Sequence, residues 1–268
     1  MKIPFWKMHG TGNDFVMVDD RDETFPVRDT AWLQSIGRRN TGIGCEGFIL
    51  IQNSDAADFR MRFLNPDGNE VEMCGNGARC VARLAHELGI TGERMTFDTA
   101  AGRLHAAIGG GKVRLEMTEP TDWRLNRELA IGSGRLTYDF VNSGVPHVVL
   151  QTEDVMKAEV IALGAEVRHH RDFAPNGANV NFVQQTGRQA LSVRTYERGV
   201  EAETPACGTG MVAAAVVFGR QGRVETPVEV KCANGDCLEV NFRLTDNGPE
   251  CVTLCGTATH VFSGSVEY

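Results

Sequence analysis

The sequence predicts an α/β (α+β) protein built from two pseudo-symmetric domains of like topology. The first observation is an internal repeat: residues 73–78 read MCGNGA and residues 206–211 read ACGTGM, with Cys207 following Cys74 by 133 residues in a chain of 268. The second is that each copy opens an apolar run with helical spacing. The third is that short strand-like runs surround each copy, so both halves carry the same kinds of element.

Further echoes occur in the same order along the two halves. In the sequence comparison of the two halves, residues 12–18 correspond to 144–150, 42–48 to 177–182, 63–65 to 196–198, and 99–102 to 232–235. Five echoes at nearly constant spacing favour two related domains, which we expect at 1–119 and 120–268, with the last few residues returning to the first domain. Two such domains facing each other would bring both cysteines to one cleft.

Composition excludes several classes of partner. The chain is 42% hydrophobic and 23% charged, which is typical of a soluble protein long enough for two cores. The net charge of −8, with no long run of Lys or Arg, argues against a nucleic-acid partner. The longest apolar run, 211–218, is too short to cross a membrane, and the N-terminus lacks the apolar core of a secretory signal. We therefore expect a cytoplasmic protein without a membrane partner.

The chain has eight cysteines. Without a secretory signal they indicate reduced thiols rather than a disulfide framework. No Cys-x-x-Cys pair occurs, and Cys251 and Cys255 stand in a strand-like stretch, so we expect no metal site.

In the first half, residue patterns predict a strand and a helix, followed by two strands and a second helix. Their ranges are 15–19 (strand, after the polar turn 10–14), 27–39 (helix, N-cap Asp29 or Thr30), 48–51 (buried strand), 60–63 (strand, closed by the turn 65–68) and 78–88 (helix, followed by Gly89). Cys74 thus stands at or just before a helix N-terminus. Paired strands follow within 96–117, and residues 119–122 read as a domain junction.

The second half repeats this plan. We expect strands in 138–150 around Ser143 and Gly144, a helix at 154–163 ended by Gly164, strands at 177–183 and 191–196, a helix at 211–218, and strands in 228–240 and 250–254. The helix at 211–218 is apolar on every side, which indicates a buried helix.

The paired cysteines suggest acid–base chemistry. A helix N-terminus presents backbone N–H groups and a partial positive charge, so it lowers a thiol pKa and binds an anion, and the flanking glycines allow close approach. Two such termini across one cleft would hold a carboxylate with a sulfur on each face of the adjacent carbon. One thiolate could remove a proton while the opposite thiol supplies one, which inverts the carbon without a cofactor. The helix ends would also stabilise the developing carbanion.

The motifs together resemble the diaminopimelate epimerase family over residues 8–264. They are Gly12-Asn13-Asp14-Phe15, Asn65-x-Asp67-Gly68, residues 72–80 around Cys74, Pro146-His147, Asn179-Val180-Asn181-Phe182, Glu197-Arg198-Gly199 and residues 206–210 around Cys207. The resemblance implies cofactor-independent interconversion of LL- and meso-diaminopimelate for lysine and peptidoglycan synthesis. It also implies that each domain is a curved, mostly antiparallel sheet around a central helix, with the site between the domains, and that the protein is a homodimer.

The resemblance assigns roles to individual residues. It implies that Cys74 and Cys207 are the acid–base pair and that His147 and Glu197 tune their protonation. The backbone of Gly75, Asn76, Gly208 and Thr209 would hold the reacting carboxylate, and the rest of the substrate would contact Asn13, Asn65, Asn179, Glu197 and Arg198. Three positions depart from the commonest pattern of the family: Glu46, Gly47 and Val145. The change at Val145 removes one side chain that could contact the distal end of the substrate.

Two other functions remain open at this stage. A proline or hydroxyproline racemase shares the paired cysteines but usually has His after the first Cys-Gly, where this chain has Asn76. A binding protein could retain the cleft without catalysis, but binding a carboxylate requires no thiol on either face.

Overall fold

The computed structural model of the chain describes residues 1–132 and 134–268. The backbone divides into two units: unit 1 comprises residues 1–115 and 256–268, and unit 2 comprises residues 116–255. The boundary expected after residue 119 therefore differs from this packing boundary by four residues. The reason is that the N–H of Met117 already donates to the carbonyl of Val252 in unit 2, at 2.9 Å.

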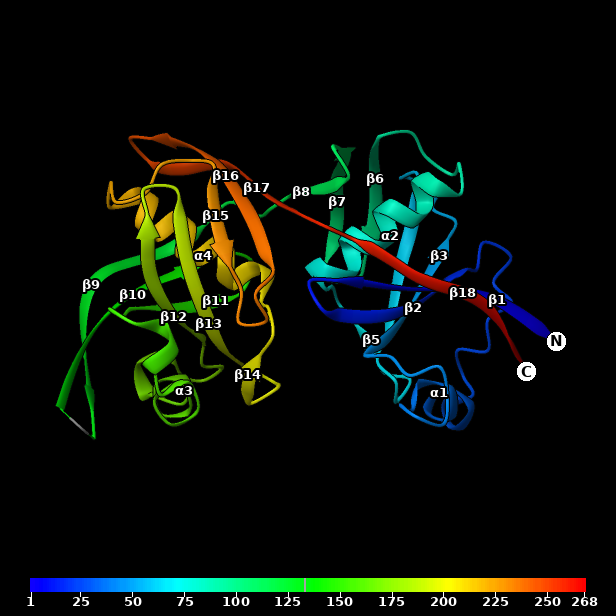
Figure 1. Cartoon of the computed structure of the whole chain (residues 1–268), viewed down its shortest axis with the longest axis horizontal. Helices are drawn as coiled ribbons and strands as arrows, with labels where there is room; N and C mark the ends of the chain where they lie inside the picture. The colour runs from blue at the N-terminus through cyan, green and yellow to red at the C-terminus, as the bar shows by residue number, and fades with distance from the viewer. Residues whose placement is uncertain (133) are drawn as a thin grey trace. The chain divides into compact units, whose positions relative to one another are not determined.

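Unit 1 is a strand-rich body with two helices. Its elements are β1 (Lys2–Gly10), β2 (Asn13–Asp19), α1 (Thr30–Gly37), β3 (Gly47–Gln52), β4 (Phe59–Leu64), β5 (Glu70–Val71), α2 (Gly75–Glu87), β6 (Arg94–Thr99), β7 (Gly102–Gly109), β8 (Lys112–Glu116) and β18 (Thr259–Glu267). The C-terminal strand β18 runs antiparallel beside β1, and the N–H of Tyr268 donates to the carbonyl of Met1 (2.8 Å), so both chain ends lie together (Figure 1).

Unit 2 contains the same kinds of element. They are β9 (Thr121–Ile131), β10 (Gly134–Asn142), β11 (Pro146–Gln151), the 3₁₀ turns η1 (Val155–Lys157) and η2 (Arg171–Phe173), α3 (Val160–Arg168), β12 (Asn179–Gly187), β13 (Ala190–Glu197), β14 (Ala202–Thr204), α4 (Gly208–Arg220), β15 (Val228–Lys231), β16 (Cys237–Thr245) and β17 (Gly248–Gly256).

The two units share one topology. In unit 1, β2 and β3 are parallel, β3 and β4 are antiparallel, and β4 pairs antiparallel with β5 and parallel with β6. In unit 2, β11 and β12 are parallel, β12 and β13 are antiparallel, and β13 pairs antiparallel with β14 and parallel with β15. In each unit the cysteine-led helix follows the short antiparallel strand. The like topology predicted from the repeat is confirmed.

Strand register corrects the spacing of the repeat. Ile49 pairs with Phe63 in unit 1, and Asn181 pairs with Thr195 at the same place in unit 2, so the strands repeat at 132 residues while the cysteines repeat at 133. The echo that set Phe63 against Tyr196 is therefore wrong by one residue, because one extra residue stands between β13 and α4. A slip of one residue exchanges the two faces of a strand, so this correction decides which side chains are equivalent.

The echo that set residues 42–48 against 177–182 is displaced as well. The parallel pairs Phe15 with Gly47 and His147 with Asn179 make Gly47 the counterpart of Asn179, again 132 residues apart. The segments that precede the two strands differ, residues 38–46 after α1 and residues 169–178 with η2 after α3, and short matches through such segments do not preserve register.

Each cysteine-led helix packs against its own sheet. In unit 2, α4 lies against the strands β10, β11, β12, β13, β15 and β16 (Figure 1). Every residue of α4 from Gly210 to Gly219 is buried. In unit 1, α2 contacts β1, β2, β3 and β7. This is the curved sheet around a central helix that the motif resemblance implied. Among the described residues, no helix is both long and apolar enough to span a membrane.

The helix expected at 154–163 is wrong in its bounds. The chain makes the turn η1 and then α3, which contains Gly164 instead of ending before it. A Cβ at position 164 would lie 2.6 Å from the Cβ of Tyr196, so glycine here allows the helix to lie close to β13. By contrast, α1 begins as expected: the side chain of Asp29 accepts from the N–H of Trp32 at 3.0 Å.

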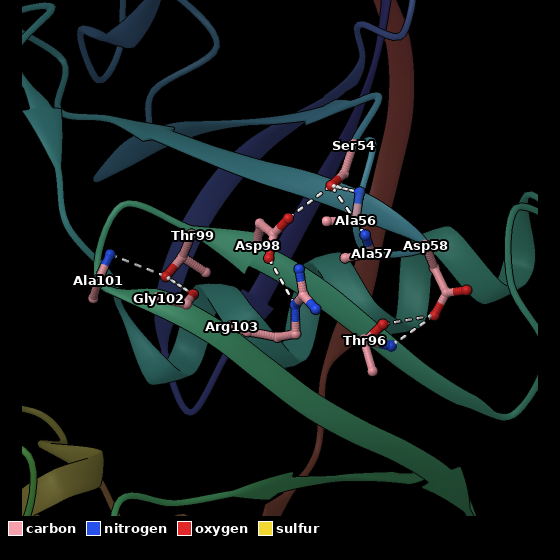
Figure 2. Close-up of polar contacts among 10 residues, drawn as sticks. All are labelled: Ser54, Ala56, Ala57, Asp58, Thr96, Asp98, Thr99, Ala101, Gly102 and Arg103. Atoms are coloured by element: carbon pink, nitrogen blue, oxygen red, sulfur yellow. Dashed lines mark hydrogen bonds and ion pairs between the residues drawn. The ribbon is translucent and has the colours of Figure 1, made fainter.

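A polar network holds β6 and β7 to the sheet of unit 1 (Figure 2). β4 and β6 pair over only two positions, and side chains supplement that short ladder. Ser54 donates to Asp98 (2.7 Å), whose other oxygen accepts from Arg103 (2.9 Å), and Asp58 accepts from the N–H of Thr96 (2.7 Å). The β6–β7 hairpin is thus fixed beside α2.

Candidate active site

Cys74 and Cys207 are the N-cap residues of two helices of 13 residues each, α2 and α4. Both have extended backbone (φ −140° and −119°), and their carbonyls accept the first helical bonds from Ala78 (2.8 Å) and Met211 (3.0 Å). Neither first turn contains an acidic residue. Each sulfur therefore lies at the partially positive end of a helix, which stabilises a thiolate and attracts an anion.

The Cys74 cluster consists of Thr11, Asn13, Cys74, Asn76 and Arg79. The amide nitrogen of Asn13 lies 3.7 Å from the sulfur of Cys74 and donates to it. The other end of this amide, Oδ1, is buried and has no hydrogen-bond partner among the residues that the structure describes. An acceptor beside the sulfur of Cys74 is thus available to a donor from outside the described residues.

Arg79 joins the polar turn at 10–14 to the first turn of α2. Its side chain is fully buried, and Nη2 donates to Thr11 Oγ1 (2.6 Å) and Asn76 Oδ1 (3.0 Å), while Nη1 donates to the carbonyl of Gly75 (3.4 Å). Sequence reasoning missed this role. The available signal was the spacing of Asn76 and Arg79, which places both on one helix face.

The same turn is anchored from its other side by Asp14. Lys7 approaches the Asp14 carboxylate to 2.5 Å, and Arg39 donates to both of its oxygens, at 2.6 and 3.1 Å. Burial raises the pKa of Asp14, but the hydrogen bonds from Arg39 and Lys7 outweigh burial and hold that pKa below its usual value. These contacts tie the turn that carries Asn13 to β1 and to the segment that follows α1.

The Cys207 cluster consists of His147, Asn181, Thr195, Cys207 and Thr209, which form one hydrogen-bonded chain. The Cys207 sulfur lies 3.5 Å from Thr209 Oγ1, which lies 2.9 Å from His147 Nε2. Asn181 Nδ2 lies 3.0 Å from His147 Nδ1, and Thr195 Oγ1 donates to Asn181 Oδ1 at 2.9 Å. His147, Asn181 and Thr195 are at most 1% exposed. This chain connects the sulfur to the sheet beneath the helix.

Strand alternation explains why these polar side chains meet. Thr195 directly pairs with Asn181 across β12 and β13, and His147 stands two residues before Val149, which packs against α4. All three therefore project from the helix-facing side of adjacent strands. Sequence reasoning identified His147 but missed Asn181 and Thr195, although the Asn-x-Asn spacing of residues 179 and 181 was a usable signal.

Burial lowers the pKa of His147 to about 3, and the positive charge of Arg198 acts in the same direction. His147 is therefore neutral at physiological pH. A neutral ring has one N–H donor and one acceptor nitrogen, so it can orient its neighbours by hydrogen bonds.

The remaining candidate residues lie in loops and strand ends. Asn179 Oδ1 accepts from the N–H of Arg198 (2.7 Å), which brings these two together. Burial raises the pKa of the Glu197 carboxyl at the end of β13. Asn65 is half-buried in the turn between β4 and β5. A Cβ at Gly75 would meet no atom within 4 Å, so the backbone after Cys74 is open to an approaching group.

The chain matches the diaminopimelate epimerase family over residues 5–123 and 140–261. It is 42% identical over 274 residues to a diaminopimelate epimerase of Aquifex aeolicus, covering 98% of this chain and 97% of the relative. The chain belongs to the diaminopimelate epimerase family. The family resemblance drawn from the motifs is thereby confirmed, and as a member of the family the chain is an isomerase of the epimerase class.

Other relatives agree. A diaminopimelate epimerase of Chlorobaculum tepidum is 39% identical over 97% of this chain and 99% of its own length. Among solved structures, a PhzF-family phenazine biosynthesis protein of Bacillus anthracis has a TM-score of 0.71 at 18% identity over both whole chains. A hydroxyproline epimerase of Agrobacterium vitis has a TM-score of 0.68 at 19% identity, over 99% of this chain and 92% of its own. At such low identity these two structures establish the fold alone.

Proposed function

We propose that this chain interconverts LL- and meso-2,6-diaminopimelate without a cofactor, with Cys74 and Cys207 as proton acceptor and donor, in lysine and peptidoglycan synthesis. One observation carries the mechanism: both cysteines are N-caps of matching helices in two units of the same topology. Family membership supports the substrate, since relatives that are 42% and 39% identical to this chain are named diaminopimelate epimerases.

The proposed reaction exchanges a proton between carbon and sulfur on opposite faces of one α-carbon. One cysteine, as thiolate, takes the α-proton while the C–H electron pair spreads into the carboxylate. The other cysteine, as thiol, gives its own proton to the opposite face of that carbon, so one sulfur gains a proton from carbon and the other loses a proton to it. The reverse direction uses the same two groups with their roles exchanged.

Stabilising the carbanion is the difficult step, because an α-hydrogen is far less acidic than a thiol. In the proposal, backbone N–H groups of Gly75, Asn76, Gly208 and Thr209 hold the carboxylate as negative charge develops on it. Each pair belongs to the first turn of a helix, where N–H groups have no intrahelical acceptor. Pre-oriented donors of this kind are worth about 3–4 kcal/mol each in known enzymes.

The side chains of the candidate site suit the rest of an amino-acid substrate. Asn13 offers the buried acceptor Oδ1, which suits the ammonium group. Arg198 provides a guanidinium for the distal carboxylate, and Asn179 fixes the backbone at Arg198. We assign Asn65 and Glu197 to the same distal end on the strength of the motif resemblance.

The first test is proton NMR of the reduced protein with LL-diaminopimelate in deuterated water, with L-proline in a parallel sample. Loss of the α-proton signal together with appearance of the meso isomer is the expected result. Exchange with proline alone would move the substrate to the racemase alternative. If neither compound exchanges its α-proton, a binding protein would be favoured.

The second test separates the two thiols from the other cysteines. Cys74→Ala and Cys207→Ala should each lower turnover by about 10³-fold or more while circular dichroism and urea denaturation remain those of the parent. Cys251→Ala, at an exposed cysteine, is the matched control and should keep full activity. Near-normal turnover in either of the first two variants would refute the two-thiol mechanism.

We also propose a cytoplasmic homodimer. The eight cysteines, which we expect as reduced thiols, support the compartment, and the family resemblance supports the dimer. Light scattering of the purified chain tests the dimer, and cell fractionation tests the compartment.

A further inference from the structure

We propose that Asn181 and Thr195 are positioning residues that fix one neutral tautomer of His147 and thereby make the Thr209 hydroxyl a hydrogen-bond donor to the sulfur of Cys207. The inference rests on the proposed function only in giving Cys207 a role as proton carrier. The hydrogen-bond arrangement itself is a property of unit 2.

The orientation of the Asn181 amide follows from its neighbours. Its Nδ2 lies 2.9 Å from the backbone carbonyl of Val148, which can only accept, so the NH₂ group must face that carbonyl and His147. On the opposite side, Thr195 donates its hydroxyl proton to Asn181 Oδ1. Exchanging the two ends of the amide would set its oxygen against the carbonyl oxygen of Val148 and lose that hydrogen bond.

The amide in turn decides where His147 carries its proton. Because Asn181 Nδ2 donates to Nδ1 (3.0 Å), Nδ1 must accept, and the single proton of the neutral ring lies on Nε2. That Nε2–H donates to Thr209 Oγ1 at 2.9 Å. A second ring proton on Nδ1 would point at the amide donor and has no acceptor there.

The position of the proton on His147 then determines which atom donates in the contact between Thr209 and the sulfur of Cys207. With one oxygen lone pair of Thr209 taken by His147, its own hydroxyl proton is available to the Cys207 sulfur, 3.5 Å away. Ser143 donates to the backbone carbonyl of Thr209 (2.9 Å), which holds this residue in place. A hydroxyl donor stabilises a thiolate more than a thiol, so the chain favours the charged form of Cys207.

Unit 1 provides an internal control. We call His147, Asn181 and Thr195, the three side chains beneath α4, the polar layer, and unit 1 builds the equivalent layer beneath α2 from apolar side chains. The counterparts of His147, Asn181 and Thr195, each 132 residues earlier, are Phe15, Ile49 and Phe63. All three are buried, and the two phenylalanine rings meet edge to face with centroids 5.7 Å apart.

The equivalence extends to the helix above this layer. A Cβ at Gly77 of α2 would lie 2.5 Å from Ile49, and a Cβ at Gly210 of α4 would lie 2.4 Å from Asn181 Oδ1. The fold therefore does not require polar side chains at these three positions beneath the helix. Burying a histidine, an amide and a hydroxyl is costly unless each is paired, so we attribute the polar layer of unit 2 to the control of Cys207.

The first experiment determines the tautomer in the whole chain without substrate. Nitrogen-15 histidine spectra distinguish Nε2–H from Nδ1–H rings, and a His147→Phe variant identifies the resonance. We expect the Nε2–H form across pH 6 to 9. An Nδ1–H ring, or a cationic ring at pH 6, would overturn the proposal.

The second experiment reads the sulfur directly. In protein labelled with carbon-13 at cysteine Cβ, the titration of Cys207 is followed in Thr209→Val and Thr209→Ser, and Cys74 in the same spectra is the control. Thr209→Val should lower the thiolate-to-thiol ratio of Cys207 at least about tenfold at a given pH, since a hydrogen bond to a charged group is lost. Thr209→Ser should restore it. An unchanged Cys207 titration in the valine variant would overturn the proposal.

A third variant replaces the polar layer by the apolar chemistry of unit 1: His147→Phe, Asn181→Leu and Thr195→Val together. We expect it to fold with at least parental stability and to show the same loss of Cys207 thiolate as Thr209→Val. A folded variant with parental Cys207 titration would contradict the inference. None of these measurements uses substrate. If the parent protein does not convert diaminopimelate but the spectra show the predicted hydrogen bonds, the proposed function is refuted and this inference is not.

Discussion

Replacing Gly210 by Ala should damage turnover more than stability. Gly210 stands in the first turn of α4, and the added Cβ would lie 2.4 Å from Asn181 Oδ1 and 3.3 Å from Thr195 Oγ1. Ordinary contact begins at 3.4 Å, so the amide must move by about 1 Å. A shift of that size disrupts the geometry of the amide's hydrogen bonds to His147 (3.0 Å) and Val148 (2.9 Å), which tolerate only a few tenths of an ångström.

The two consequences have different sizes. Alanine favours a helix by about 1 kcal/mol over glycine, while overpacking costs about 1–3 kcal/mol, so the free energy of unfolding should fall by only about 0–2 kcal/mol. Turnover should fall about 100-fold, because a displacement of about 1 Å next to a reacting group has that effect in enzymes.

The other end of the same helix provides a matched control. A Cβ at Gly219 would also lie 2.4 Å from its nearest atom, but that atom is the ring carbon Cζ of Phe242 in the apolar core. Gly219→Ala should therefore lose stability by a similar mechanism and keep its kcat. The assay is the proton NMR conversion of diaminopimelate, with urea denaturation for stability. Equal kcat in the two variants would refute the argument that the Asn181 network supports Cys207.

Three further predictions concern other parts of the chain. Arg79→Met should lower the free energy of unfolding in urea by about 3 kcal/mol, because Thr11 and Asn76 lose a buried donor; a loss below about 1 kcal/mol would contradict this. Asp14→Asn should be less stable than the parent at pH 7. The difference in the free energy of unfolding should shrink as pH falls below about 4. A lowered carboxyl pKa stabilises the fold at pH values above the unfolded pKa, and this stabilisation is lost as pH falls through the folded pKa. An equally large difference at pH 3 in urea titrations would contradict this prediction. Burial raises the pKa of the Cys80 thiol to about 12, so iodoacetamide at pH 8 should leave Cys80 unlabelled until denaturant is added, as peptide mass spectrometry would show; labelling of the folded chain would refute this.

The helix starts could be predicted from sequence because their causes are local. A cysteine followed by Gly-x-Gly and an apolar run fixes the helix start within a few residues, and both Cys74 and Cys207 are N-caps as expected. The same locality explains the success at Asp29, whose side chain caps a helix only three residues away. The fold class followed from repetition of these local patterns.

What could not be predicted depends on pairing between distant residues. The 132-residue offset of the strands is visible only in their register, and the short matches used instead set Phe63 against Tyr196. Asn181 and Thr195 meet through a strand pair, and His147 reaches Thr209 across 62 residues. Gly164 was read as a helix terminator because the tight contact that requires it, with Tyr196, lies on another element.

The corrected register also shows where the two halves differ. Beneath α2 the layer is Phe15, Ile49 and Phe63, and polar contacts reach the Cys74 region from the turn that carries Asn13. Beneath α4 the layer itself is polar and ends at Cys207. In the proposed reaction one cysteine must be a thiolate while the other is a thiol, so identical surroundings would give both sulfurs the same proton affinity. Different partners let the proton affinity of each sulfur be set separately on two copies of one backbone.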